Sequence, residues 1–471
     1  MGIRLDWEVE RETVARELGE SPADVRWRRA NGGRALLAML LIVLLILVVA
    51  GGILARLWYV DQELKRQLRE TVAAEAAALR VGDLAAFLAI QRSGSAAWML
   101  GQAERFWQYQ ELKRQADVDV SGKVIDLAVD ESRAWVLVEE TINGIAYRQV
   151  WFYWRYADGW RHVPRDITFW GAPATISGGN FTLSYGSLDG PLAEALRPGL
   201  ESLWGQGCAW LDCPEPLPLL TVRIMPDPFV EVSWSPDEAD VLRVASPLLG
   251  RARVDVPLEP DLARRIGDLL AERVLIQAGS APVEDAAHDA AFLRAALRDW
   301  LVGRFLGDGG APGSSFVESL VTAYGERAAA LLASRVMPDS GIDILAHIFA
   351  TPLEALPVDW REFFQWRLAL EPFLLAQGLP DTLRGLYDPA AQSAAEALIA
   401  DFAAGVAPPV PTVVRVITGI GSDGGNCAWA IVQDAEGHQA PITFRLVDGV
   451  WRRGIPDPAF AVYAGTAEDT D

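Results

Sequence analysis

The pattern of apolar and polar positions divides the chain into stretches of different character. Residues 35–55 read ALLAMLLIVLLILVVAGGILA, an unbroken apolar run without a charge. At about 1.5 Å rise per residue, a helix of this length crosses the roughly 30 Å hydrocarbon layer of a bilayer. We therefore predict a transmembrane helix at 35–57, followed by Trp58 and Tyr59 as interfacial aromatic residues. The alternative is a cleaved signal peptide, but 34 residues precede the run, which also exceeds a usual signal core.

The orientation of this helix depends on weaker signals. Four basic residues lie within fifteen positions on each side of the run, so the positive-inside count is tied. A compact Trp-Arg-Arg patch precedes the run, and all three cysteines follow it. These features favour a single-pass protein of the cell membrane, with residues 1–34 as a cytoplasmic tail and the C-terminal part as an extracytoplasmic ectodomain.

Beyond the run, the pattern changes from helical to strand-like. Apolar residues at Leu64, Leu68, Val72 and Ala76 predict a helix that ends near Gly82. Between residues 118 and 170, β-branched and aromatic residues alternate with polar ones, and turn signals stand at Asp130-Glu131, Asn143-Gly144 and Asp158-Gly159. Helices followed by a curled antiparallel sheet predict a cone-shaped α+β unit.

The order of helices and then strands, ending in YADGWRHVPRDITFWG, resembles the nuclear transport factor 2-like superfamily over residues 61–172. The resemblance implies a cone in which sheet and helices enclose a pocket. In that superfamily the pocket serves enzymes and simple binding or scaffold modules alike, so the resemblance carries no catalytic motif.

The C-terminal part repeats this sequence pattern. Residues 442–460, ITFRLVDGVWRRGIPDPAF, match 150–169, VWFYWRYADGWRHVPRDITF, in an aromatic strand, an Asp-Gly turn, Trp-Arg, and then Pro and Asp before a closing Phe. We predict a second cone-like α+β unit at 371–462. Residues 463–471 are predicted to be a disordered tail.

Residues 180–370 begin with short strands and become mostly helical, with helices predicted at 258–279, 290–307 and 315–336. The order of a strand layer, the turn VLRVASPLLG and these helices resembles the membrane-associated zinc peptidases of the gluzincin type. That resemblance implies a zinc-binding His-Glu-x-x-His helix at the first predicted helix.

The chain lacks the peptidase motif where the resemblance places it. The expected helix reads RRIGDLLAERV from Arg264 onward, without histidine. Asp268 and Glu272 share a helix face, but two carboxylates without nitrogen ligands make a poor zinc site. The whole chain has four histidines, none of them paired at the spacing of metal ligands. We expect a degenerate domain with no metal, no cofactor and no catalytic residue, and a solvated surface at this helix.

A second apparent motif also has a simpler interpretation. Gly419, Gly421 and Gly424 satisfy G-x-G-x-x-G, the glycine pattern of dinucleotide-binding loops. Strand-like residues flank the motif on both sides, and no helix follows to receive a phosphate. We therefore predict a hairpin loop.

Composition places further limits on function. The 471 residues carry 42 basic and 63 acidic side chains, a formal charge of -21, and 51% are hydrophobic. Residues 1–34 hold seven of each sign, so the negative charge lies beyond the membrane run. Such acidity argues against nucleic acid as a partner, since phosphates need a basic surface. The fold class is α+β multi-domain.

The cysteines are few. Cys208 and Cys213 bracket AWLD and are close enough for a small disulfide loop, the alternative being two buried thiols. Cys427 is left single. The spacing of the pair differs from the C-x-x-C of redox and zinc sites.

Aromatic residues are the remaining candidates for binding. Trp151, Tyr153, Trp154 and His162 could line the cone and stack on a ring or an apolar chain. The simpler alternative is that these rings only fill the core. We expect a non-enzymatic ectodomain that binds an unknown protein or small molecule and is held in the bilayer by its helix. The alternative is a membrane-anchored hydrolase or isomerase that uses the Trp-rich cone, with His162 as acid or base.

Overall fold

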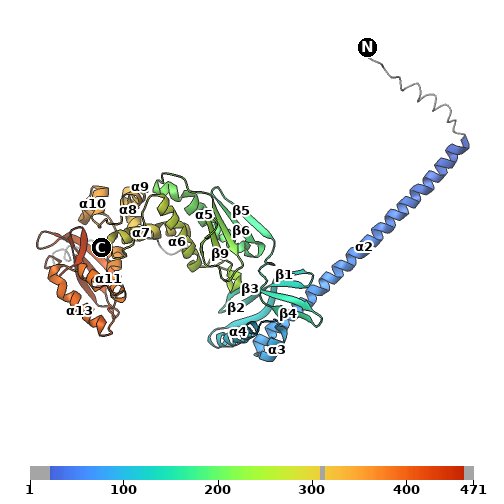
Figure 1. Ribbon diagram of the computed structural model, residues 1–471, viewed down its shortest axis with the longest axis horizontal. Coiled ribbons are helices and arrows are strands. Elements are labelled where there is room, and N and C mark those ends of the chain that lie inside the picture. The colour runs from blue at the N-terminus through green and yellow to red at the C-terminus, as the bar shows by residue number, and fades with distance from the viewer. Residues whose placement is uncertain (1–21, 308–312, 461–471) are drawn as a thin grey trace, which may run out of the picture. The chain divides into compact units, whose positions relative to one another are not determined.

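The computed structural model describes residues 22–307 and 313–460 (Figure 1). It is an α+β protein with three sheets, a helical region and one long apolar helix near its N-terminus. The predicted tail at 463–471 and most of the predicted cytoplasmic tail lie outside the described residues. The α-helices are α2 (Pro22–Val81), α3 (Leu84–Ile90), α4 (Ala96–Gln115), α5 (Gly190–Leu211), α6 (Pro260–Gln277), α7 (Asp289–Leu306), α8 (Ser315–Tyr324), α9 (Arg327–Arg335), α10 (Ile344–Phe349), α11 (Trp360–Ala376), α12 (Pro380–Gly385) and α13 (Gln392–Ala403).

The strands fall into three sheets. The first contains β1 (Val118–Asp130), β2 (Arg133–Ile142), β3 (Ile145–Tyr156), β4 (Gly159–Val163) and β10 (Ala252–Arg253). The second contains β5 (Pro173–Ser177), β6 (Phe181–Gly186), β7 (Leu220–Met225), β8 (Ser233–Trp234) and β9 (Val241–Ala245). The third contains β11 (Thr412–Ile420), β12 (Asn426–Gln433), β13 (Gln439–Val447) and β14 (Val450–Arg453). The chain forms two compact units, one of residues 1–139 and 151–164, the other of residues 140–150 and 165–471.

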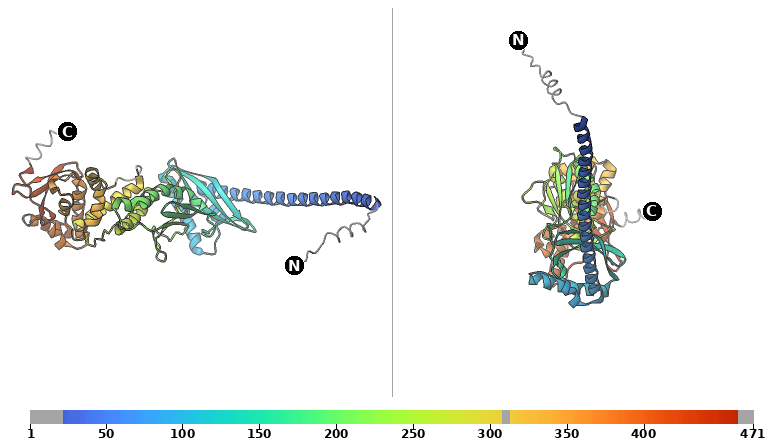
Figure 2. Two further views of the ribbon diagram at one scale, coloured as in Figure 1. Left: turned by 90° about the horizontal axis from the view of Figure 1, so that it is seen from above. Right: turned by 90° about the vertical axis from the view of Figure 1, so that its right-hand side faces the viewer.

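Helix α2 changes its surroundings along its length (Figures 1 and 2). From Leu37 to Val60 its large apolar side chains are exposed. It is the one helix in the described part of the chain that is long and apolar enough to cross a membrane. Farther on, the same helix packs on β1 and buries one face, formed by Leu68, Val72, Ala76 and Leu79.

The end of α2 follows from its sequence. Gly82 takes a left-handed conformation, φ +83°, which costs glycine little and stops the helix after Val81. The side chain of Asp83 then accepts a hydrogen bond from the Ala86 amide at 3.0 Å and caps α3. The predicted break near Gly82 therefore has a local cause.

The first sheet is antiparallel, with β2 between β1 and β3 and with β4 paired to β3. Asn143 and Gly144 connect β2 to β3, and both have positive φ, as a two-residue hairpin turn requires. Gly122 interrupts β1 at φ +67°, where α2 crosses the strand. A side chain there would put its Cβ 2.7 Å from the Cβ of Ala76, so only glycine lets the helix approach this closely.

The second unit holds the mixed second sheet, in the order β5-β6-β7-β9-β8, with parallel pairing of β6 to β7 and of β7 to β9. Helix α5 connects β6 to β7, and α5, α6 and α7 pack together on a core rich in leucine. The predicted helix at 315–336 is two helices in the structure. Gly325, at φ +81°, ends α8, and α9 begins at Arg327.

The third sheet is a four-stranded antiparallel meander that packs on α11, where the rings of Phe364 and Phe444 lie 4.6 Å apart. Its last hairpin and the β3–β4 hairpin both contain Asp-Gly and bury a following tryptophan, Trp451 or Trp160. In the last hairpin Asp448 and Gly449 form the two-residue turn, whereas in the β3–β4 hairpin Gly159 already belongs to β4 and pairs with Tyr156. The Asp-Gly pair therefore lies one residue later relative to the turn in the β3–β4 hairpin. Helix α11 continues across residues 370–371, the boundary that the sequence predicts between the domains at 180–370 and 371–462.

Candidate functional site

The four aromatic and histidine candidates lie on β3 and β4 of the first unit. Trp151 and Tyr153 alternate with Phe152 along β3 and are buried, and His162 of β4 pairs in register with Tyr153. Trp154 lies one position farther along β3 and is 47% exposed. The structure therefore groups Trp151, Tyr153 and His162, and it leaves Trp154 at the surface.

The centre of this group is a carboxylate that the sequence interpretation missed. Glu75 of α2 is 1% exposed, and its Oε1 lies 2.7 Å from Nδ1 of His162. Its Oε2 accepts a hydrogen bond from the Tyr153 hydroxyl at 2.8 Å, and Oε1 also accepts one from the Gln91 amide at 3.0 Å. In the sequence, the only sign of a role for Glu75 is that this charged residue stands next to Ala76 on a helix face that is otherwise apolar.

Electrostatics favour an ionised Glu75. Burial by itself raises the pKa of its carboxyl group, but attraction to the His162 imidazole and the three hydrogen bonds hold that pKa below its usual value. Burial and the nearby carboxylate raise the pKa of the Tyr153 hydroxyl well above normal, so it stays a neutral donor. A carboxylate only accepts hydrogen bonds, hence Nδ1 of His162 carries the proton that it donates.

Tryptophan rings surround the histidine. The ring of Trp151 stacks on His162 at a centroid distance of 5.6 Å, and Trp98 of α4 meets it edge-on at 5.9 Å. The guanidinium of Arg105 lies over the Trp151 ring, 5.8 Å from its centroid. Among the described residues, the buried polar atoms of this unit that have no hydrogen-bond partner include Oε1 of Gln91, Oε1 of Gln102, and Nε1 of Trp98 and Trp151.

Such atoms matter because an unsatisfied buried polar group costs about 1–3 kcal/mol. Trp98 and Gln102 lie on α4, Trp151 lies on β3, and Gln91, which also donates a hydrogen bond to Glu75, directly follows α3. The arrangement offers an imidazole, a carboxylate, indole donors and amide acceptors within one small unit. It can recognise a polar or aromatic group or move a proton between acid and base forms.

The helix at which the peptidase motif would lie is α6. Glu272 forms two hydrogen bonds of 2.6 Å with Arg294 of α7, and Asp268 lies 3.6 Å from Arg298 of the same helix. Both carboxylates therefore have an arginine of the neighbouring helix beside them. The residues do not fit the zinc ion that the gluzincin resemblance implies.

The G-x-G-x-x-G segment begins in β11, where Gly419 pairs with Cys427, and continues through the β11–β12 hairpin loop, which holds Gly421 and Gly424. Beside it, ligand atoms of Asp423, Cys427 and Asp457 lie within 4.8 Å of one another, the one such triplet among the residues described. Arg445 binds both carboxylates, at 2.9 Å for Asp457. Burial raises the pKa of the Cys427 thiol to about 11, so the thiol is protonated at neutral pH. The ion pairs of Arg445 with Asp423 and Asp457 hold this cluster together, so the cluster needs no metal.

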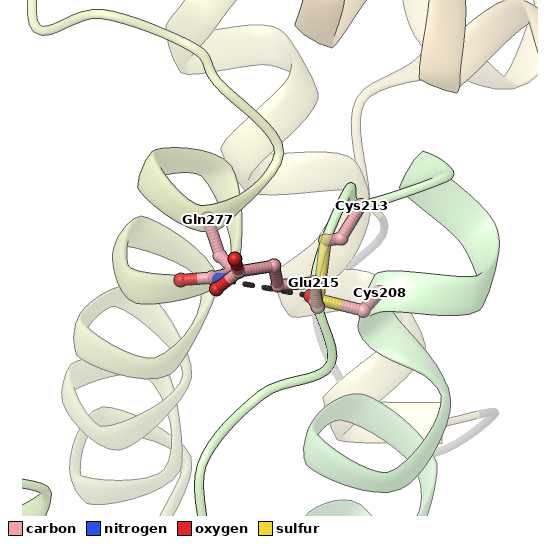
Figure 3. Close-up of a disulfide and its surroundings, with 4 residues drawn as sticks. All are labelled: Cys208, Cys213, Glu215 and Gln277. Atoms are coloured by element: carbon pink, nitrogen blue, oxygen red, sulfur yellow. Dashed lines mark hydrogen bonds between the residues drawn. A yellow bond between two sulfur atoms is a disulfide. The ribbon is translucent and has the colours of Figure 1, made fainter.

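The two other cysteines form a disulfide (Figure 3). Cys208 lies in the last turn of α5, and left-handed Asp212, φ +52°, turns the chain so that the Cα of Cys213 comes within 4.9 Å of that of Cys208. The side chain of Gln277, on α6, donates a hydrogen bond to the Glu215 carbonyl just beyond the loop, at 3.4 Å.

Comparison with known proteins gives no relative: no family model, no curated protein and no solved structure matches this chain.

Proposed function

We propose that this chain is a single-pass membrane protein whose extracytoplasmic ectodomain binds a protein or small-molecule partner and has no peptidase activity. The N-terminal tail is cytoplasmic, and α2 anchors the chain through residues 35–57. The ectodomain consists of a nuclear transport factor 2-like cone at 61–172, a degenerate gluzincin-like domain at 180–370 and a second cone-like unit at 371–462.

The observation that carries the membrane assignment is the exposed apolar surface of α2. A helix that shows large apolar side chains from Leu37 to Val60 is not stable in water, whereas lipid accommodates it. The Cys208–Cys213 disulfide supports an oxidising compartment for the ectodomain. It therefore also supports a cytoplasmic N-terminus.

The pairing of α6 with α7 supports the absence of peptidase chemistry. Glu272 is hydrogen-bonded to Arg294, and Asp268 lies 3.6 Å from Arg298, so each carboxylate has an arginine beside it, which disfavours a cation at the same place. Metal analysis of the purified full-length chain should find no stoichiometric zinc, and the chain should not cleave peptides. Zinc at one ion per chain together with peptide cleavage would contradict the proposal.

The Glu75–His162 pair favours one alternative, a hydrolase or isomerase that works in the cone. A buried carboxylate that orients an imidazole is a usual arrangement for general acid–base catalysis. The two functions differ in how they respond to His162→Gln. An enzyme would lose turnover of its substrate while still binding it, whereas a binding module has no turnover to lose.

A further inference from the structure

A surface groove of about 230 Å³ lies between α2 and β1 in the first unit. It is lined by Gln62, Lys65 and Arg69 of α2 and by residues 124–127 of β1. Pockets for drug-sized ligands start at roughly 300 Å³, so this groove has room for a small chemical group only.

The cations of the groove are available for a ligand. Lys65 pairs with Asp61, one turn earlier on the same helix, at 2.7 Å, and exposed pairs of this kind are weak. Among the residues that the structure describes, the Arg69 guanidinium has no hydrogen-bond or ion-pair partner. The single carboxylate of the groove, Asp126, accepts a hydrogen bond from the Leu127 amide at 2.8 Å. The groove therefore presents two cations against one carboxylate and favours an anion.

The position of the groove along α2 specifies the kind of anion. The apolar run ends at Arg56, and α2 continues without a break, so Gln62 lies about 9 Å and Arg69 about 20 Å farther along the axis. The headgroup layer of a bilayer extends about 5–8 Å beyond the hydrocarbon. The exposed apolar side chains of α2 continue to Val60, four residues beyond Arg56, which shortens both distances to the lipid by about 6 Å. Helical side chains lean toward the N-terminus of their helix, so the long side chains of Lys65 and Arg69 extend back toward the lipid phosphates.

Local charge here differs from that of the whole ectodomain. The chain carries -21 overall, and an acidic surface avoids anionic lipid. Residues 56–70, however, contain four basic side chains (Arg56, Lys65, Arg66 and Arg69) and three acidic ones (Asp61, Glu63 and Glu70). The stretch next to the membrane is thus slightly positive.

We infer that this groove binds the phosphate-bearing headgroup of an anionic phospholipid in the outer leaflet, with Lys65 and Arg69 on the phosphate and Gln62 beside it. The inference depends on the membrane anchoring proposed above. A bound headgroup would fix the height and rotation of the first unit on the membrane, because the groove and the anchor share one helix.

Native mass spectrometry of the full-length chain in detergent tests this inference, with titrations of dioleoyl phosphatidylglycerol and dioleoyl phosphatidylcholine. The wild-type chain should bind one phosphatidylglycerol in preference to phosphatidylcholine. Each neutralised cation should weaken phosphatidylglycerol binding about fivefold. The double variant Lys65→Gln/Arg69→Gln should therefore lose the preference, and Lys65→Arg/Arg69→Lys should keep it.

Arg80→Gln is the matched control, since Arg80 is an exposed arginine of α2 outside the groove. It should retain the wild-type preference. Equal binding of the two lipids by the wild-type chain, or an unchanged preference in the double glutamine variant, would overturn the inference. Displacement of the lipid by an equal concentration of glycerol 1-phosphate would do so too, because the groove would then be a site for free phosphate esters.

Alkaline extraction of membranes separates this inference from the proposed function. If the wild-type chain is released, the membrane anchoring itself fails. If it is retained but shows no lipid preference, the headgroup site alone fails.

Discussion

Oε1 of Glu75 and Nδ1 of His162 lie 2.7 Å apart in the interior of the first unit, although the two residues are 87 positions apart in the sequence. The pair joins the helix that carries the predicted membrane span to the last strand of the antiparallel β1–β4 sheet. Because Glu75 also accepts from Tyr153 and Gln91, it ties α2, α3, β3 and β4 to one carboxylate.

Removal of this carboxylate should be costly. Truncation in Glu75→Ala leaves the donors of His162, Tyr153 and Gln91 unpaired, and loss of one partner of a buried pair costs about 3–5 kcal/mol. The Tm of the full-length chain in detergent should fall clearly. Glu70→Ala is the matched control on the exposed face of α2, where its bond is to Arg66 alone, and it should change the Tm little. Equal effects of the two variants would contradict the central place given to Glu75.

The same carboxylate should give the stability a pH dependence. Its pKa is lower in the folded protein than in the unfolded chain, so folding is favoured above the unfolded value of about 4.3. That contribution is lost as the pH falls through the folded pKa. Thermal unfolding between pH 3 and pH 6 should therefore show a steeper loss of Tm at low pH for the wild type than for Glu75→Gln. Parallel curves would rule out an ionised Glu75.

Asp189 should have the opposite dependence. It is 1% exposed, and it binds the Ser246 hydroxyl and, at 2.7 Å, Nε1 of Trp170. Burial raises the pKa of its carboxyl group to about 6 despite these bonds. The folded state then holds a proton that the unfolded chain releases near pH 4, so stability falls as the pH rises from about 4 to 6.

The isosteric variant Asp189→Asn removes this charge and keeps one acceptor for Trp170 and one donor for Ser246. It should raise the Tm at pH 7.5 and have little effect at pH 4. A shift of about two pKa units corresponds to about 3 kcal/mol at most. A variant that is destabilised equally at both pH values would show that the carboxylate form is needed.

Gly122 should tolerate no side chain. Gly122→Ala would put a Cβ 2.7 Å from the Cβ of Ala76 and hold an alanine at φ +67°, at a combined cost of about 2–5 kcal/mol. Gly144→Ala is the control, because Gly144 has φ +79° but no atom within 4 Å of its added Cβ. It should cost only the backbone part, about 1–2 kcal/mol. Equal losses of Tm would show that α2 does not press on β1 at this point.

The sequence predicts the regular parts of this fold because their causes are local. The apolar run at 35–55, the break at Gly82 and the turn at Asn143-Gly144 each follow from residues next to one another in the chain. The helix predicted at 315–336 is split because Gly325 takes a left-handed conformation, an effect that apolar periodicity does not detect.

The candidate site was predictable only in part. The alternation of β3 places Trp151 and Tyr153 on one face and Trp154 on the opposite face, so the strand pattern alone separates Trp154 from the other two. Glu75 contacts residues of β3 and β4, and such a long-range partner has no signature in a single sequence. The arginines that pair with Asp268 and Glu272 were hidden for the same reason, because they come from the neighbouring helix.

The two ends of the chain should lie on opposite sides of the membrane. Labelling with a membrane-impermeant maleimide measures this in intact cells and in permeabilised cells. Glu436→Cys places a thiol at an exposed position beyond the anchor, whereas the native Cys427 is buried and should give no background. We expect Glu436→Cys to be labelled in intact cells and a cysteine introduced within residues 1–20 to be labelled only after permeabilisation. The reverse pattern, or labelling of both positions only after permeabilisation, would contradict an extracytoplasmic ectodomain on a single membrane-spanning helix.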